Sequence, residues 1–261
     1  MQGIVKIQLL QFLTVYLLLL IVLFIMKKAK VSETRLLFTA CLRMTVQLAA
    51  AGYLLTYIFK KPNPAVTVLY VAAMLCFAVY RVIKPNKKLN RRFKLAIALS
   101  LCFSGVAVLL FMIIAVIGES PFNPQYVIPL GGMIIGNTMT GVSLAVKTFL
   151  DSFSGQRLKI ETLLNMGAEP KKILMPFVNR AFETAILPTL NSMLGMGLVS
   201  LPGMMTGQIL SGTVPTTAIL YQIAIMICIC TAVCVAVFSS LYIGCRTMYN
   251  SRKQILFISE K

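Results

Sequence analysis

Three consecutive pieces of sequence decide the fold: GGMIIGNTMTGVSLAVKTF at 131–149, ETLLNMGAEPKK at 161–172, and LPTLNSMLGMGLVSLPGMMTGQILSG at 187–212. The first and third are membrane-like segments rich in Gly, Ser, Asn and Pro, and the second is a charged segment typical of a cytoplasmic helix. Flexible polar backbone is tolerated at membrane depth only where it packs against protein or lines a cavity. The order of the pieces therefore indicates a transport pathway joined to an element that moves it.

Apolar runs of membrane-spanning length continue on both sides of this region. The chain of 261 residues is 58% hydrophobic, and a helix needs about 20 mostly apolar residues to cross a bilayer core. None of the runs alternates strictly, as barrel strands do. We therefore expect an all-α, polytopic integral membrane protein with seven transmembrane helices. The predicted spans are 9–26, 36–59, 64–83, 95–118, 130–149, 185–210 and 215–244.

The basic residues are concentrated in alternate loops. The net charge is +18, and Lys and Arg cluster at 27–35, 84–94 and 147–180 and again from Arg246 onward. Because positive loops stay on the cytoplasmic side, we expect the N-terminus outside and the C-terminus inside the cytoplasmic membrane of a bacterium. Topology and contact with anionic lipid headgroups explain the charge, so we do not expect nucleic-acid binding.

The chain is expected to form one permease domain, residues 1–261, with a cytoplasmic coupling loop at 150–182. Residues 1–26 resemble a signal peptide only superficially, since their apolar run is long and its charges follow it. We expect this run to remain as the first span.

Residue types needed for several kinds of chemistry are scarce or absent. The sequence has no His, seven Cys and seven acidic residues, and it contains neither CxxC nor a Walker A motif. A carboxylate cage for a hard cation cannot be built within the membrane from one copy. Methionine thioethers at 193–205 are soft ligands that favour Cu(I), but Met also commonly fills membrane cores. The sequence does not identify metal ligands, and we expect no catalytic residues and no cofactor bound by this chain.

Two spans carry polar candidates for the pathway. Arg43 and Gln47 lie four residues apart in the second span, where a guanidinium is costly unless it faces protein or water, or snorkels to the interface. In the fifth span, Asn137 needs its own partner or a cavity. Ser143 belongs to a stripe of small residues, which more often serves helix packing than transport.

The 185–210 segment combines polar side chains with helix breakers. Asn191, Ser192 and Gln208 supply the polar groups, while Pro202 and Gly203 interrupt the helix. A proline inside a helix removes a hydrogen bond and bends it, and broken helices form sites and hinges near the midplane of transporters. We expect Pro202 and its glycines to act as a hinge that exposes backbone carbonyls.

Three blocks carry a resemblance to a known family: GGMIIGNTMTGVSLAVK at 131–147, NMGAEPKKILMPFVNRA at 165–181, and PTLNSMLGMGLVSLPGMMTGQILSG at 188–212. Together they resemble the FetB-type permeases, the membrane component of an iron-export ABC transporter, to which plant aluminium-tolerance half-transporters are related. The resemblance covers nearly the whole chain. It implies iron efflux, which the carboxylate-poor pathway does not independently support.

The charged segment also resembles the EAA-x-x-x-G coupling loop of bacterial ABC permeases. Glu161 and Gly167 have the spacing of that motif, although Thr and Leu replace its two alanines. Gly167 and Ala168, followed by Pro170, are typical of a helix stop and turn. This resemblance implies a short helix that docks on a separate ATPase.

We therefore expect the membrane subunit of an ABC exporter, with ATP and Mg²⁺ bound by a cytoplasmic ATPase partner and the permease acting as a homodimer. Export of another metal or of a sugar nucleotide stays open. An ATPase-independent secondary transporter or channel would explain the broken helix equally well, but it leaves 161–172 without a role. An intramembrane enzyme is a weaker alternative, because no nucleophile and base pair is present.

Overall fold

The computed structural model describes residues 9–30, 34–86, 89–250 and 255, and within these ranges every element of regular structure is a helix. The elements are α1 (Leu9–Lys28), α2 (Thr34–Lys60), α3 (Pro64–Ile83), α4 (Arg91–Phe111), the π-helix η1 (Met112–Ile117), α5 (Pro124–Gly155), α6 (Arg157–Asn165), α7 (Pro170–Gly195), α8 (Gly203–Leu210) and α9 (Pro215–Arg246). The expected all-α class is confirmed.

Local sequence sets where the helices begin. Proline is the first residue of α3, α5, α7 and α9, a position where its missing N–H costs nothing. The side chain of Asn63 accepts a hydrogen bond from the Ala65 N–H at 3.0 Å, and that of Asn123 accepts one from the Gln125 N–H at 3.2 Å. These two caps fix the starts of α3 and α5.

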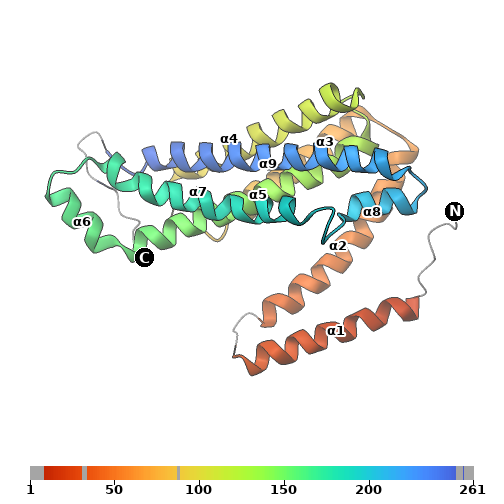
Figure 1. Cartoon of the computed structure of the whole chain (residues 1–261), viewed down its shortest axis with the longest axis horizontal. Coiled ribbons are helices and arrows are strands. Elements are labelled where there is room, and N and C mark those ends of the chain that lie inside the picture. The colour runs from red at the N-terminus through yellow and green to blue at the C-terminus, as the bar shows by residue number, and fades with distance from the viewer. Residues whose placement is uncertain (1–8, 31–33, 87–88, 251–254, 256–261) are drawn as a thin grey trace.

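Helix α9 is central to the bundle. It packs against α4, α5, α7 and α8, while α5 also packs against α3, α4 and α7 (Figure 1). Phe93 of α4 and Phe149 of α5 are fully buried at this core, with ring centroids 6.1 Å apart. The close packing of α4, α5 and α9 gives the other helices a rigid support.

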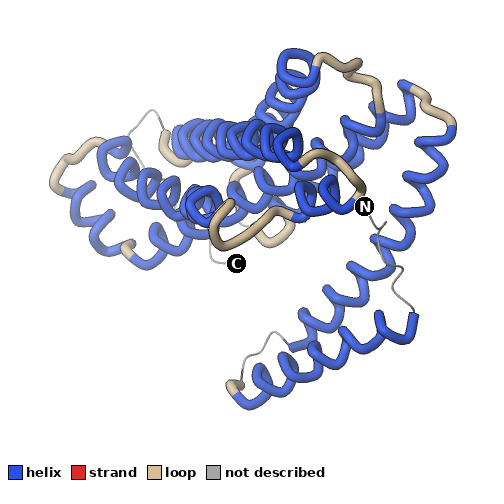
Figure 2. Tube along the Cα trace, turned by 45° about the vertical axis from the view of Figure 1, so that its right-hand side comes forward, coloured by secondary structure: helices blue, strands red, loops and turns tan. Residues whose placement is uncertain are grey.

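Helices α1 and α2 form an arm that stands apart from the rest of the bundle (Figures 1 and 2). The two helices are joined by a hydrogen bond of 2.6 Å between the hydroxyls of Tyr16 and Thr45. Ile58, near the end of α2, is the buried residue that this arm contributes among its described side chains. The arm therefore meets the bundle mainly where α2 turns into α3.

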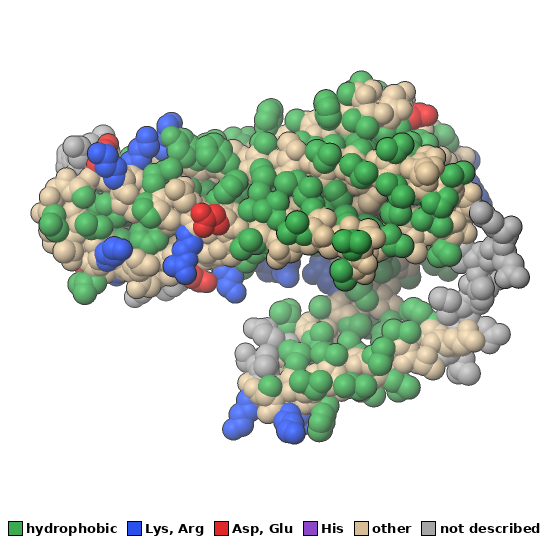
Figure 3. Space-filling view, viewed as in Figure 1, with side chains coloured by type: hydrophobic (Ala, Val, Ile, Leu, Met, Phe, Trp, Pro, Cys, Tyr) green, Lys and Arg blue, Asp and Glu red, His purple; other side chains and the backbone are tan. Residues whose placement is uncertain are grey.

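Most of the segments predicted to be basic lie at one end of the molecule, whereas Lys27 and Lys28 end α1 on the separate arm. The end of α3, the start of α4, α6 and the end of α9 all lie toward the same side, where Lys and Arg side chains gather (Figures 1 and 3). Asn90 Nδ2 donates to the Thr247 carbonyl at 3.3 Å, which joins two of these ends directly. Hydrophobic side chains dominate the middle of the face in Figure 3. The orientation of this bundle in a membrane stays a prediction.

Most predicted spans correspond to single helices. Five helical stretches in the described part of the chain are long and apolar enough to cross a membrane: α2, α3, α4 with η1, α5, and α9. Helix α1 covers the first predicted span with 20 residues, and the total of seven spans stays a prediction.

The structure changes the prediction in two places. The predicted span 185–210 is not one helix, because α7 ends at Gly195 and α8 begins only at Gly203. The helices on either side of the expected coupling loop are also longer than predicted, because α5 continues to Gly155 and α7 already begins at Pro170; the coupling loop 150–182 itself stays a prediction. Pro176 and Pro188 lie inside α7 without ending it.

Candidate functional site

Helix α6 lies at the extreme end of the bundle, between α5 and α7 (Figure 1). Ile160 is fully buried and fixes one face of α6 to the bundle. The opposite face presents Leu158 and Met166, which are 79% and 78% exposed, beside Thr162 and Asn165. The free face combines two large apolar side chains with polar ones, as a protein-docking surface does.

The predicted coupling residue Glu161 lies at the edge of this face. Its Oε1 is 2.9 Å from Nε of Arg157, one helical turn earlier, and both side chains are partly exposed. An exposed pair at this spacing stabilises a helix by only about 0.3–0.5 kcal/mol. The pair orients the Glu161 carboxylate more than it stabilises the fold.

Gly167 ends α6 as the sequence predicts. Its φ is +81°, a left-handed conformation that favours glycine. The N–H of Gly167 donates to the Leu164 carbonyl at 2.9 Å, and the N–H of Ala168 donates to the Leu163 carbonyl at 3.0 Å. This pair of bonds is a Schellman motif. Pro170 then starts α7 directly, so the turn between α6 and α7 has a fixed geometry.

A basic cavity of about 350 Å³ lies between α6 and α7. Its lining includes Lys159 of α6 together with Lys172 and Arg180 of α7, and no carboxylate. Because three cationic side chains line this one cavity, a protein that binds at this end of the molecule is expected to carry acidic groups on its contact surface.

The break between α7 and α8 is a closed loop at 196–202. The Gly195 carbonyl accepts hydrogen bonds from the N–H groups of Val199 and Ser200 at 3.0 and 3.2 Å, and the Gly197 N–H donates to the Ser200 carbonyl at 3.0 Å. Gly197 has a φ of +84°. The loop satisfies several of its own backbone groups, which suits membrane depth.

The structure corrects the expected position of Pro202, while its role as a hinge stays a prediction. Pro202 is not inside a helix but caps the start of α8, with φ −61° and ψ 145°. The reversal of the chain depends on Gly197, which adopts the left-handed conformation, while Gly203 is the first residue of α8. The carbonyls of Gly195 and Ser200 are bonded within the loop rather than presented to a substrate.

A cavity of about 480 Å³ lies between this loop, α7, α8 and α9. It is lined by Met193, Met196, Gly197, Leu201, Pro202, Met205, Ile219, Gln222, Ile223, Met226 and Ile227. Of the predicted pathway residues, only Pro202 lies in this lining.

Gln222 is a functional candidate that the sequence reasoning missed. It is 6% exposed, and its Nε2 and Oε1 atoms are buried without a hydrogen-bond partner. Leaving a buried polar group unpaired costs about 1–3 kcal/mol. The signal in the sequence was a single amide within the long apolar run of the last span.

The other predicted residues of 185–210 lie outside the lining. Asn191 and Ser192 are exposed on α7, and the Ser192 hydroxyl donates to the Pro188 carbonyl at 2.9 Å. Gln208 is partly buried on α8. These side chains do not converge on one site within the chain.

The polar residues of the second span are exposed on the arm. Arg43 and Gln47 are both exposed on α2. The Arg43 guanidinium lies 5.6 Å from the centroid of the Phe77 ring on α3, which is within the range of a cation–π contact. The Arg43 side chain therefore contacts protein, while the arm leaves Gln47 on its surface.

In the fifth span, α5 holds Asn137 on its exposed side and Ser143 in a partly buried position. The Asn137 amide donates to the Met133 carbonyl of its own helix at 2.7 Å. Among the glycines of α5, Gly141 has the tightest contact with another helix, since a Cβ atom there would lie 2.8 Å from Cγ1 of Val233 on α9. Gly141 does not belong to the predicted stripe, which Ser143 shares with Gly132, Gly136 and Thr140.

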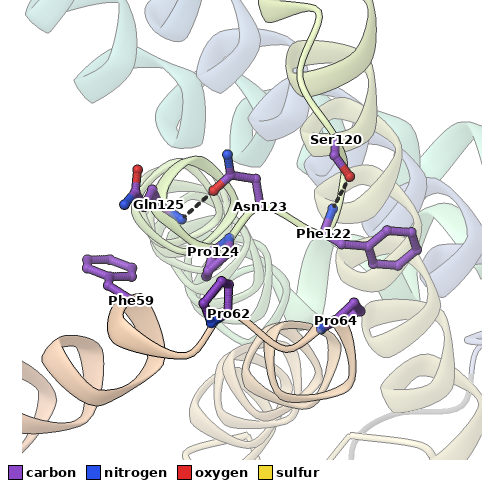
Figure 4. A pocket seen from close by; sticks show the side chains of 8 residues that line it. All are labelled: Phe59, Pro62, Pro64, Ser120, Phe122, Asn123, Pro124 and Gln125. Carbon is purple, nitrogen blue, oxygen red and sulfur yellow. Dashed lines mark hydrogen bonds between the residues drawn. The ribbon is translucent and has the colours of Figure 1, made fainter.

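A third cavity, of about 370 Å³, lies at the opposite end from α6, between the α2–α3 turn and the start of α5 (Figure 4). Asn123 and Ser120 line it, but Asn123 caps α5 and the Ser120 hydroxyl accepts from the Phe122 N–H at 3.4 Å. Thr67 Oγ1 donates to the Phe122 carbonyl at 3.2 Å. The polar groups here secure a junction between helices.

No group of three or more His, Cys, Asp or Glu side chains that could hold a metal ion occurs in the part of the chain that the structure describes. The functional groups among the side chains that line the cavity beside Gln222 are all neutral: one amide and four thioethers. Its chemistry suits uncharged or soft ligands better than hard cations.

Comparison with known proteins is consistent with this architecture. The chain is 37% identical over 222 residues to the UPF0014 membrane protein slr1647 of Synechocystis sp., covering 82% of this chain and 83% of that protein. It is 32% identical to the "Probable iron export permease protein FetB" of Escherichia coli, covering 82% of each chain. It is also 32% identical to the protein ALUMINUM SENSITIVE 3 of Arabidopsis thaliana, covering 82% of this chain and 77% of that protein. No solved structure matches the chain.

The match to a family model covers almost the whole bundle, from residue 9 to residue 249, and therefore includes α6, the 196–202 loop and the cavity beside Gln222. Together with the apolar helices, it shows a multi-pass membrane protein. The chain belongs to UPF0014, described as an uncharacterised protein family.

Proposed function

We propose that this chain is the permease subunit of an ABC exporter, driven by a separate cytoplasmic ATPase. Helix α6 is the observation that carries the proposal. It is a short helix held at the tip of the bundle by Ile160, closed by the Schellman motif at Gly167, and free on the face that includes Leu158 and Met166. Because α6 is connected to α5 on one side and to α7 on the other, a movement of the bound partner can be transmitted through it to both helices.

The charge around α6 supports an acidic or mixed docking partner. The cavity between α6 and α7 is lined by Lys159, Lys172 and Arg180, so an ATPase surface carrying carboxylates near its docking groove would be complementary. In this scheme ATP and Mg²⁺ are bound by the partner. Two copies of the permease would present two coupling helices to two ATPase subunits.

The break between α7 and α8 supplies the part that changes shape. Helix α7 begins at the coupling end and stops at Gly195, where the 196–202 loop meets the cavity beside Gln222. Displacement of α6 would pull directly on the start of α7 through the short 166–169 turn. We propose that this motion opens and closes access around the loop.

Iron is the first substrate to test, because one of the relatives is named as a probable iron export permease. Another metal or a sugar nucleotide stays the alternative cargo. The expected direction is out of the cytoplasm.

The decisive experiment is reconstitution with candidate ATPase subunits. The permease should co-purify with an ATPase, raise its ATP hydrolysis, and move iron across proteoliposomes only when ATP is present on the ATPase side. Iron movement at the same rate without ATPase or ATP would instead assign the chain to the secondary transporters or channels. Stimulated ATP hydrolysis without iron movement would keep the ABC assignment and exclude iron.

A further inference from the structure

The unpartnered amide of Gln222 marks a binding site. Among the described residues, its Nε2 and Oε1 are the buried side-chain atoms left without any hydrogen bond. Other polar side chains buried in the bundle, such as Thr138, donate to carbonyls of their own helices. Because buried polar groups are normally paired, an unpaired donor and acceptor on one side chain point to an absent ligand.

The space beside Gln222 has the size of a small-molecule site. The cavity measures about 480 Å³, within the range of roughly 300–1,000 Å³ that is typical of ligand pockets. Its walls come from the end of α7, the 196–202 loop, α8 and α9. A single dehydrated ion would leave most of this volume empty.

The lining contains no charged side chain. Apart from Gln222, its only side-chain atoms other than carbon are the thioether sulfurs of Met193, Met196, Met205 and Met226. A bare hard cation or an anion would lose its hydration there without an opposite charge to compensate. Methionine is flexible and polarisable, so the same walls can adapt to apolar molecules of different shape.

We propose that this cavity binds an uncharged organic molecule with an apolar body and a head group that both donates and accepts hydrogen bonds. A primary amide, an alcohol or a protonated carboxylic acid has that chemistry. Both amide atoms are covered by protein in this structure, so binding requires the Gln222 side chain to turn toward the cavity, where its carbonyl accepts from the head group and its NH₂ group donates to it. The binding requires the folded permease but not the ATPase, so it can be tested separately from the proposed function.

Competition against a photoactivatable probe tests the role of the head group. The probe is dodecanamide carrying a diazirine on its chain, crosslinked to the permease in lipid nanodiscs and mapped by mass spectrometry. The unlabelled competitors are dodecanamide, which donates and accepts, methyl dodecanoate, which only accepts, and dodecane, which does neither. Crosslinks should fall on the lining of the cavity. Dodecanamide should compete about tenfold better than dodecane, as two modest net hydrogen bonds predict, with the ester between them.

Two variants separate the amide from general apolar binding. Gln222→Leu keeps a similar volume and removes an unpaired polar group, so it should fold at least as stably and should bring the three competitors to equal potency. Gln125→Leu removes an exposed amide at the far junction and should leave the tenfold ranking intact.

Three results would overturn the proposal. Equal competition by all three molecules in the native protein would show that the cavity binds apolar chains, such as those of lipids, without recognising a head group. An unchanged ranking in Gln222→Leu would exclude the amide from recognition. Displacement of the probe by Ag(I), without competition by dodecanamide, would assign the four methionines to a soft cation.

Discussion

Gly244 of α9 lies directly against the ring of Phe93 of α4: a Cβ atom at position 244 would be 2.6 Å from Cε1 and Cζ of that ring. The Phe93 ring is fully buried and meets Phe149 on another side. It therefore has little room to move, and the spacing of α4 and α9 depends on the absence of a side chain at 244.

We expect Gly244→Ala to destabilise the bundle by about 1–3 kcal/mol, the usual cost of overpacking a core. Thermal unfolding of the detergent-purified protein measures this as a lower Tm. Gly136→Ala on α5 is the matched control, because a Cβ atom there would meet nothing within 4 Å, and it should raise the Tm slightly through helix propensity. Equal Tm values for the two variants would show that α4 and α9 do not approach as closely as described.

The orientation of the bundle can be tested by cysteine labelling. With the seven native cysteines replaced by alanine, Leu158→Cys on α6 should react with a membrane-impermeant maleimide only after the cells are opened. Ser120→Cys, in the exposed turn before α5, should react in intact cells. The reverse pattern would place α6 outside and remove the basis for ATPase coupling.

The turn at Gly167 should be sensitive to backbone conformation rather than to size. A Cβ atom at 167 would meet nothing within 4 Å, but the φ of +81° is unfavourable for most residues. Gly167→Val should therefore impair stimulation of the ATPase, whereas Gly167→Asn, which tolerates the left-handed region, should retain most of it. Both variants should insert in the membrane. Equal stimulation by both would mean that the Schellman turn has no part in coupling.

Glu161 and Arg157 provide a test of docking that does not depend on stability. Because their ion pair contributes little to the fold, Arg157→Gln should leave the Tm unchanged and reduce ATPase affinity only modestly. Glu161→Lys removes the carboxylate that a cation on a mixed partner surface would meet, and it puts a like charge there, so it should weaken association much more. Pull-down of the ATPase over a salt series measures the difference. If Arg157→Gln weakens association as strongly as Glu161→Lys does, the partner requires the intact ion pair rather than the Glu161 carboxylate alone.

The 196–202 loop should depend on Gly197 more than on Pro202. Pro202→Ala should keep transport per assembled complex within about twofold of native, the range of mild substitutions, because Pro202 caps α8 and does not bend a continuous helix. Gly197→Val should lower transport strongly, because its φ of +84° would have to change. Normal transport in Gly197→Val would show that the loop is only a connector.

The sequence predicted those elements that local rules determine. The predicted span 64–83 has the bounds of α3, and Gly167 predicts the end of α6, because caps and left-handed glycines act within a few residues. The start of α5 was predicted too late: Pro129 resembles a helix boundary, yet the helix passes through it from Pro124. Pro129 itself is exposed, but the buried side chains of Ile128 and Leu130 on either side of it hold the helix in place despite the missing hydrogen bond.

Features that depend on distant residues were not predictable from local pattern. Nothing in the sequence around Gly244 indicates that it packs against Phe93. The apolar run around Gln222 likewise does not indicate that the amide stays without a hydrogen-bond partner. Likewise the 185–210 segment has the composition of one span, and only the hydrogen bonds at Gly195 distinguish a closed loop from a bent helix.

The arm formed by α1 and α2 has a consequence for the order of assembly during synthesis. Tyr16 and Thr45 bond within a helical hairpin that precedes the rest of the bundle along the chain, so α1 and α2 can pair before the later helices have been made. Phe93 must wait for Gly244, near the end of the chain, before α4 can seat against α9. The translocon should therefore release the hairpin early and hold or shield the later helices until α9 has been made.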